Sequence, residues 1–155
     1  MQTFLPYRSY LHSAVCLDRQ RLGKQRVECK QILTAIEGRS RGWQNHPATR
    51  MWRECPRGLA YYAIHMCDEW RRRGYKDNLT RFFFDYLGVY CLGELHRIRD
   101  EEIEETGRDP LAPSWLGMEA LHMSHRAALL RKNPGHYAQE QWEDVDTNMP
   151  YWWPA

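Results

Sequence analysis

The sequence lacks any long hydrophobic run. No apolar stretch among its 155 residues approaches the roughly 20 residues that a helix needs to cross a bilayer. The first segment, MQTFLPYRSYLH, also lacks the extended apolar core of a secretory signal. From these two absences we expect a protein of the cytoplasm that has no membrane partner.

Motifs for metals, disulfides and nucleotide cofactors are equally scarce. The five cysteines are odd in number and form no CxxC pair, which favours reduced core residues over disulfides or zinc ligands, although a catalytic thiol stays open. His122 and His125 have the spacing of two metal ligands, but no third ligand accompanies them, so a surface or helix-packing role is the better interpretation. GxGxxG and P-loop patterns are missing. We expect neither a metal nor a cofactor.

Charge is plentiful and unevenly distributed. Residues 1–76 hold 15 Lys and Arg against 6 Asp and Glu, a net charge of +9, whereas residues 77–155 hold 7 against 14, a net charge of −7. Of the 22 basic residues, 18 are arginine, the side chain suited to phosphate groups and to stacking on flat rings. The asymmetry favours nucleic acid as the partner of the first half, with a simple solvated basic face as the alternative.

The hydrophobic spacing predicts an all-α fold, because apolar residues recur at helical intervals and no segment alternates as a strand would. Asp18 is a plausible N-cap, Gly38 a helix stop, and Pro47 a first-turn residue. Trp52 and Trp70 fall at core spacing. The expected helices cover residues 8–17, 18–37, 47–55, 56–73, 77–87, 93–105 and 118–132.

The second predicted helix carries one carboxylate on a basic side. Leu22, Cys29 and Leu33 share its core face, while Glu28 lies one turn from Lys24 on the polar side. By charge pattern alone, this is an ordinary Lys–Glu pair that contributes only about 0.2–0.5 kcal/mol. The periodicity alone gives no reason to assign Glu28 a functional role.

Four motifs, in order, give a second reason to single out Glu28. RLGKQRVE (21–28), NHP (45–47), DEWRRRGY (68–75) and SHRAALLRKNPGHY (124–137) resemble the pyrimidine dimer DNA glycosylase family, the endonuclease V type of a T-even phage and of related bacterial and viral proteins. MQTFLP at the start and MPYWWP near the end resemble one branch of it. Only about residues 80–112, with the acidic run RDEEIEE, look like an insertion.

The resemblance implies a fold, an activity and a location. Family members are single compact helical domains, of the T4 endonuclease V type, that bind bent double-stranded DNA without a metal, so we expect one domain over residues 1–155 and a monomer. Their N-terminal amine attacks C1′ of the damaged nucleotide, cuts the base–sugar bond and leaves an imine, and β-elimination then breaks the strand. The expected setting is the cytoplasm of a bacterial or phage-infected cell.

The resemblance also assigns residues. Glu28 matches the glutamate that assists both steps, and Arg21 falls where the phage enzyme has a histidine near the sugar; with Met1 they form the predicted catalytic set. Arg126, Arg131 and Lys132 match a phosphate-binding region, and Trp152 belongs to an aromatic C-terminal segment where stacking on a base and packing on the core are equally plausible. The other predicted DNA contacts are Gln2, Thr3, Lys24, Gln25, Arg26 and His46.

The identity of the nucleophile rests on ordinary acid–base chemistry. An α-amine has a pKa of about 7.7–8.0 and a lysine about 10.4, so near neutral pH the α-amine is roughly a few hundredfold richer in the reactive form. The phage relative exposes a threonine after losing its first methionine, whereas this chain begins Met1-Gln2. We therefore predict the Met1 amine as nucleophile, with Lys24 in reserve.

Three functions stay open at this point. The first is a glycosylase and lyase that acts on pyrimidine dimers. The second keeps this chemistry but acts on another damaged or modified pyrimidine. The third is a member of the family that has lost catalysis and only binds DNA.

Overall fold

The computed structural model describes residues 1–154. All regular secondary structure among these residues is helical, and no strand is present among them. This confirms the all-α prediction. The helices are α1 (Tyr10–Cys16), α2 (Arg19–Ile36), α3 (Pro47–Trp52), α4 (Pro56–Arg72), α5 (Thr80–Leu87), α6 (Leu92–Thr106), α7 (Glu119–Lys132) and α8 (Pro134–Tyr137), followed by a 3-10 turn at Ala138–Glu140.

Several helix boundaries follow from the residues that the sequence pointed to. The Asp18 side chain accepts a hydrogen bond from the Arg21 N–H and so caps α2. Gly38, just after α2, has φ +74°, a left-handed conformation that glycine adopts at little cost. Pro47 and Pro56 each begin a helix. The short helix α8 was not predicted, since its four residues are too few for a periodic pattern.

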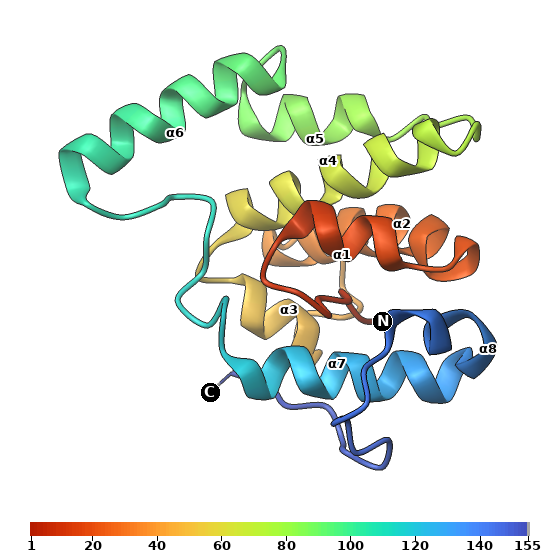
Figure 1. Ribbon diagram of the computed structural model, residues 1–155. Helices are drawn as coiled ribbons and strands as arrows, with labels where there is room; N and C mark the ends of the chain where they lie inside the picture. The colour runs from red at the N-terminus through yellow and green to blue at the C-terminus, as the bar shows by residue number, and fades with distance from the viewer. Residues whose placement is uncertain (155) are drawn as a thin grey trace.

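Two long helices, α2 and α4, form the centre of the molecule; α1 packs on α4, α3 packs mainly on α2, and α5 packs along α4 (Figure 1). Trp52 and Tyr62 are fully buried between them, so the packing role predicted for Trp52 is confirmed. Trp70 is half-buried against α2: a Cβ on Gly23 would meet its ring at 3.1 Å. This contact is tighter than most contacts of real side chains, so a larger residue at position 23 would require the Trp70 ring to shift by a few tenths of an ångström.

The extended N-terminal segment runs between the helices instead of lying on the surface. Residues 2–5 are all buried, and the N-terminus ends between α2 and α7 in Figure 1. Chain ends are usually exposed and poorly anchored, so this burial sets the first residue in a defined place.

Helix α6 projects away from this centre. In Figure 1 it lies above α5 at one end of the molecule and returns to α7 through a long loop. Its apolar side covers a small separate cluster that includes Val89, Leu95 and Leu111. None of the helices in residues 1–154 has both the length and the apolar composition required to cross a membrane.

Candidate active site

Gln25 fixes the N-terminal segment against α2. Its side-chain oxygen accepts hydrogen bonds from the Phe4 N–H at 2.9 Å and the Tyr62 hydroxyl at 2.8 Å. Its side-chain nitrogen donates to the Gln2 carbonyl at 3.0 Å and approaches Glu28 Oε2 at 3.4 Å. One buried amide therefore holds both the start of the chain and the carboxylate one turn further along the helix.

Side chains from other helices complete the anchoring. Trp52 Nε1 donates to Thr3 Oγ1 at 2.8 Å. The Leu5 N–H donates to His125 Nδ1 and the Leu5 carbonyl pairs with His122 Nδ1, both at 2.8 Å. These contacts confirm the packing role predicted for the two histidines. Burial lowers the pKa of His122, and full burial next to His122 lowers the pKa of His125 to about 3. Both rings therefore stay neutral, the state in which they form these hydrogen bonds with the Leu5 backbone.

The anchored chain end meets Glu28 at a small cavity. The Gln2 N–H donates to Glu28 Oε2 at 3.2 Å. The cavity has a volume of about 250 Å³ and is lined by Met1, Gln2, Phe4, Arg21, Lys24, Gln25, Glu28, Lys132 and Tyr151. Thus the structure brings the three predicted catalytic residues, Met1, Glu28 and Arg21, to one place; their roles stay predictions.

Positive charge surrounds this cavity. Lys24 and Lys132 line it and are exposed. Arg21 forms an ion pair at 3.0 Å with Asp18, the residue that caps the start of α2. Hydrogen bonds from Asn133 and Arg21 outweigh the effect of burial and lower the pKa of Asp18, which stays ionised. A single carboxylate, Glu28, therefore faces several cations across a space large enough for a small group.

His46 lies close enough for its pKa to be affected by both the N-terminal amine and Glu28. Burial lowers its pKa, the positive charge of the N-terminal amine lowers it further, and the Glu28 carboxylate opposes the shift. Its Nδ1 accepts a hydrogen bond from the Ala48 N–H at 3.1 Å and caps α3. The neutral ring then carries its proton on Nε2. The prediction that His46 contacts DNA stays a prediction, and the structure adds a capping role.

Four of the predicted DNA contacts are buried, which the sequence pattern did not indicate. Gln2, Thr3, Gln25 and Arg26 expose 7% of their surface or less, although Gln2 and Gln25 line the cavity. Contact between these four side chains and DNA stays a prediction. Arg26 forms an ion pair with Asp77 at 2.6 Å. Its guanidinium was expected on the polar side of the helix, but its partner lies 51 residues further along the chain, beyond the reach of a local pattern.

The basic residues of α7 divide into two groups. Lys132 lines the cavity. Arg131 instead donates to the backbone carbonyls of Thr147 and Met149, the latter at 2.9 Å, and holds the C-terminal segment. Arg126 donates to the Pro6 carbonyl at 2.8 Å and pairs with Glu119 at 3.0 Å. Phosphate contacts by Arg126 and Arg131 stay predictions, and both side chains already have structural partners.

Sequence reasoning missed Tyr151 as a residue of the site. The C-terminal segment brings its ring onto the cavity and edge-on to His125, with 5.8 Å between ring centroids. Burial raises its pKa, so its hydroxyl stays protonated. The neighbouring Trp152 is half-buried and packs against the core. The motif MPYWWP indicated this segment, but no spacing rule indicated which ring would meet the cavity.

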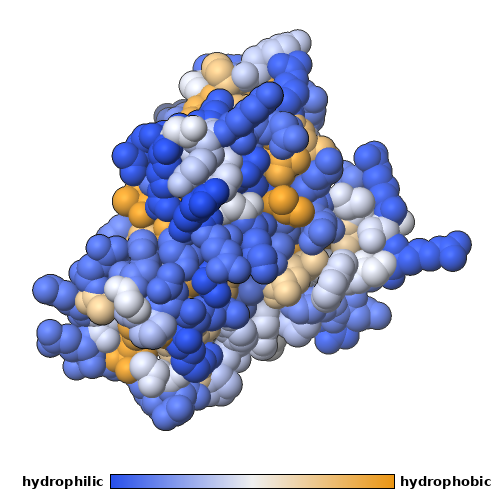
Figure 2. All heavy atoms as spheres, turned by 90° about the vertical axis from the view of Figure 1, so that its right-hand side faces the viewer, coloured by the Kyte–Doolittle hydropathy of each residue, from blue (hydrophilic) through white to orange (hydrophobic). Residues whose placement is uncertain are grey.

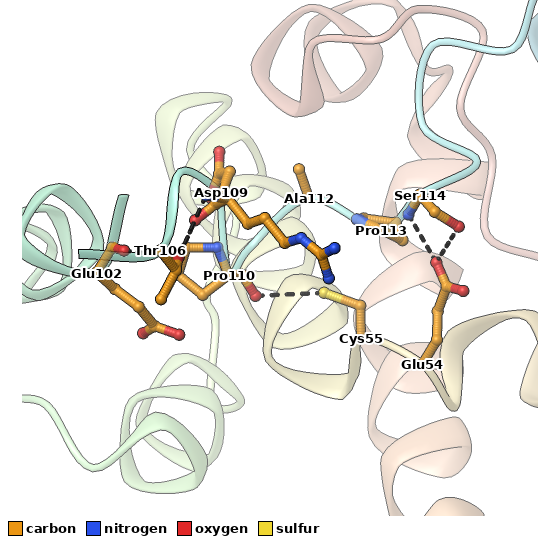
Figure 3. A pocket seen from close by; sticks show the side chains of 10 residues that line it. Glu54, Cys55, Glu102, Thr106, Asp109, Pro110, Ala112, Pro113 and Ser114 are labelled. Atoms are coloured by element: carbon orange, nitrogen blue, oxygen red, sulfur yellow. Dashed lines mark hydrogen bonds between the residues drawn. The ribbon is translucent and has the colours of Figure 1, made fainter. Parts of the chain in front are cut away.

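A larger cavity lies elsewhere and contains none of the predicted site residues. It has a volume of about 1030 Å³ and lies between the start of α4, the end of α6 and the loop that follows α6 (Figure 3). Glu54 accepts hydrogen bonds there from the Ser114 N–H and hydroxyl, and Cys55 Sγ donates to the Pro110 carbonyl at 3.3 Å. Three carboxylates, Glu54, Glu102 and Asp109, line it against one cation, Arg108, and this excess of negative charge is unfavourable for DNA phosphates.

Within residues 1–154 no three His, Cys, Asp or Glu side chains come together as a metal-binding group. Four of the five cysteines are buried and Cys91 is exposed. Burial raises the pKa of Cys16, Cys29, Cys55 and Cys67. Raised pKa values keep these thiols protonated and unreactive, which supports the interpretation of the four as core residues.

The fold and the site together define a helical protein whose candidate active site includes its own chain terminus. A family model described as pyrimidine dimer DNA glycosylase matches residues 1–83, more than half of the chain, and the protein belongs to this family. Membership implies a DNA repair glycosylase whose substrate is DNA. No curated protein and no solved structure matches the chain.

The family match includes one part of the candidate site and leaves out another. It covers α1 to α4 and ends inside α5, so it includes Met1, Arg21, Glu28 and His46. Helix α7, which contributes Lys132, and the C-terminal segment, which contributes Tyr151, lie outside the match. Those parts of the site depend on the geometry alone.

Proposed function

We propose that the protein cleaves the glycosidic bond of a pyrimidine dimer in double-stranded DNA and then breaks the strand, with the Met1 amine as nucleophile and Glu28 as the acid–base residue. The observation that carries the proposal is the common cavity of Met1 and Glu28, with the Gln2 N–H bound to the Glu28 carboxylate. A terminal amine and a carboxylate beside one another are the groups that this chemistry needs.

The reaction can be written with its electrons in place. The nitrogen lone pair of Met1 attacks C1′ of the sugar, and the electron pair of the bond between C1′ and the pyrimidine leaves with the base. The nitrogen loses one proton, and its lone pair then opens the sugar ring: the bond between C1′ and O4′ breaks, O4′ takes up a proton, and a protonated imine forms between Met1 and C1′. Removal of a C2′ proton then expels the 3′ phosphate by β-elimination.

Glu28 can serve both stages. As a carboxylate it stabilises positive charge that develops on the sugar while the base departs. It then accepts the proton taken from C2′. Its hydrogen bonds to the Gln2 N–H and to Gln25 orient the carboxylate toward the chain end, so little reorganisation is needed when the sugar arrives.

The surroundings of the cavity support a DNA-binding face. Arg21, Lys24 and Lys132 line it and are suited to the phosphates on either side of the reacting sugar. On the side of the molecule drawn in Figure 2, polar side chains cover most of the surface and the apolar atoms form separate small areas. We place Trp152 and Tyr151 at the margin of the proposed DNA-binding face around the cavity, where an aromatic ring can contact a base.

The protein is further proposed to act as a monomer and as one domain in the cytoplasm. One continuous core with residues from Phe4 to Tyr137 supports a single domain. Residues 80–112, proposed as a family-variable insertion, form α5, α6 and the loop after them. They contribute the buried Phe83 to that core, and several partly buried apolar residues of the segment pack against it.

Borohydride trapping tests the function. The protein is incubated with a duplex that holds one cyclobutane pyrimidine dimer, with an undamaged duplex and with a duplex that holds an oxidised pyrimidine, each in the presence of borohydride. Reduction of an imine attaches the enzyme to DNA covalently, and we expect attachment only to the dimer duplex. Attachment to the oxidised pyrimidine duplex alone would establish the alternative substrate. Binding with no attachment to any duplex would establish a DNA-binding protein without catalysis.

A further inference from the structure

Trp43 is the one exposed tryptophan in the described part of the chain. Its exposed fraction is 51%, whereas Trp52 and Trp115 are buried and the other four are half-buried. It belongs to the loop that joins α2 to α3, and the flanking residues Arg39 and Arg41 are also exposed. A single exposed ring is common on protein surfaces, so the backbone conformation of Trp43 and its ring contacts carry more weight than its exposure.

The backbone of Trp43 is also unusual. Its φ is +65°, in the left-handed region that bulky side chains rarely adopt and that glycine adopts freely. Gly42 directly precedes it, so a tight turn could be made at that position with less strain. Strained backbone at a non-glycine residue persists where surrounding contacts impose it, and such positions concentrate at functional sites.

The contacts of the loop hold Trp43 in this conformation. The His46 N–H donates to the Trp43 carbonyl at 3.1 Å. The Gln44 side chain donates to the Ser40 carbonyl at 2.8 Å, and Arg53 donates to the Gln44 carbonyl at 2.6 Å. The ring is therefore presented by a loop with internal hydrogen bonds at several points.

A series of ring contacts joins Trp43 to the active-site cavity. The Trp43 ring lies edge-on to His46, with 5.4 Å between centroids, and His46 lies edge-on to Trp153 at 6.2 Å. Trp153 in turn lies 5.7 Å from Tyr151, which lines the cavity. His46 is also close enough to feel the charges of the N-terminal amine and Glu28.

We propose that Trp43 stacks on a nucleobase that becomes unstacked beside the lesion when the duplex opens at the active site. The ligand is thus a flat heteroaromatic base of the substrate DNA, with Arg39 and Arg41 near its flanking phosphates. Opening a duplex costs a few kcal/mol, and stacking of the freed base on an exposed indole returns part of that cost. This inference rests on the proposed function, because it assigns Trp43 to the same DNA complex.

The test compares Trp43→Ala, Trp43→Phe and Trp43→Gly with a control, Tyr90→Ala. Tyr90 is an aromatic residue with an exposed fraction of 83%, next to the start of α6. Single-turnover cleavage of the dimer duplex is measured against enzyme concentration. A second set of dimer duplexes carries 2-aminopurine, in turn, opposite the lesion and at each flanking base, because stacking on an aromatic ring quenches its fluorescence.

Trp43→Ala should raise the enzyme concentration for half-maximal cleavage by about tenfold or more, Trp43→Phe should retain most of the affinity, and Tyr90→Ala should match the wild type. One 2-aminopurine position should be quenched by wild type and by Trp43→Phe but not by Trp43→Ala. Trp43→Gly should lose affinity as Trp43→Ala does while its melting temperature stays equal or rises, because glycine relieves the positive φ.

Two failures are distinguishable. If wild type is trapped on the dimer duplex but Trp43→Ala binds, cleaves and quenches as the wild type does, the stacking role is wrong and the proposed function stands. If the wild type is not trapped on the dimer duplex, the proposed function is wrong, and the 2-aminopurine comparison on the same duplexes still decides whether Trp43 contacts a base.

Discussion

The backbone N–H of Gln2 donates a hydrogen bond of 3.2 Å to Oε2 of Glu28. This contact joins the second residue of the chain to the middle of α2, 26 positions away. It brings the first residue of the chain and Glu28 to the same cavity. The proposed chemistry depends on this one relationship.

Glu28→Gln should abolish strand cleavage while DNA binding stays nearly unchanged. The amide keeps an oxygen for the Gln2 N–H but cannot accept a proton from C2′, and general acid–base residues typically contribute about 10²–10⁴-fold in rate. Cleavage of the dimer duplex and binding by anisotropy give the two readouts. Glu37→Gln, an exposed change at the end of the same helix, is the control. Equal cleavage by Glu28→Gln and wild type would remove Glu28 from the mechanism.

Blocking the N-terminal amine should stop imine formation. Acetylation, or extension of the chain by a few residues ahead of Met1, removes the basic nitrogen from the cavity. Mass spectrometry identifies the first residue of each preparation, and borohydride trapping on the dimer duplex reports the imine. If trapping persists on the blocked protein, Lys24, which lines the same cavity, becomes the nucleophile, and Lys24→Ala should then abolish it.

Gln25→Leu should lower the free energy of unfolding by several kcal/mol and slow cleavage as well. The change leaves the Phe4 N–H and the Gln2 carbonyl without their buried partner, and each such group costs about 1–3 kcal/mol. Urea denaturation measures the first effect and single-turnover kinetics the second. Gln31→Leu, an exposed change on α2, should leave both nearly unaltered. A Gln25→Leu protein as stable as wild type would contradict the anchoring role.

Lys132→Ala should make DNA binding less sensitive to salt. Each lost phosphate contact lowers the slope of log affinity against log salt concentration by about one unit, on all sequences alike. Lys30→Ala is the matched control, because Lys30 lies over the Phe82 ring with 5.0 Å from its Nζ to the ring centroid. Equal slopes for the Lys132→Ala and Lys30→Ala proteins would place the DNA face away from the cavity.

His125 should make the protein less stable in acid. Its pKa is lowered to about 3 in the fold by burial and by His122, against about 6.5 in an unfolded chain. Between these values the unfolded chain binds a proton that the native state does not. Stability therefore falls as pH drops from about 6.5 toward 3, by up to about 1.4 kcal/mol per pH unit from this group.

The pH effect is measured by denaturation of wild type and His125→Gln across pH 4 to 8. Glutamine keeps an acceptor for the Leu5 N–H, so the variant should fold and lose stability less steeply in acid. Some slope will remain, because burial also lowers the pKa of His122 and His65. His12→Gln changes an exposed ring and should follow the wild type. Identical slopes for all three proteins would contradict the assignment to His125.

Local features of the sequence were sufficient for most of the secondary structure. Asp18 predicted the start of α2 and Pro47 the start of α3, because caps and first-turn prolines act on neighbouring backbone groups. Cys29 and Leu33 were correctly assigned to the core face of α2. The polar face was predicted less well, since Arg26 turned out to be buried with Asp77. A helical pattern says which residues share a face, but not which charged groups a distant segment will cover.

The sequence by itself determined an all-helical chain with a basic first half and singled out Glu28 and the chain end as candidates. Only the tertiary structure decided that Met1 and Glu28 share a cavity, that Gln25 anchors both, and that Tyr151 and Lys132 complete the lining. The reason is physical: capping and periodicity act within a few residues, whereas the site is assembled by the packing of α2, α7 and both terminal segments, whose contacts join residues more than a hundred positions apart.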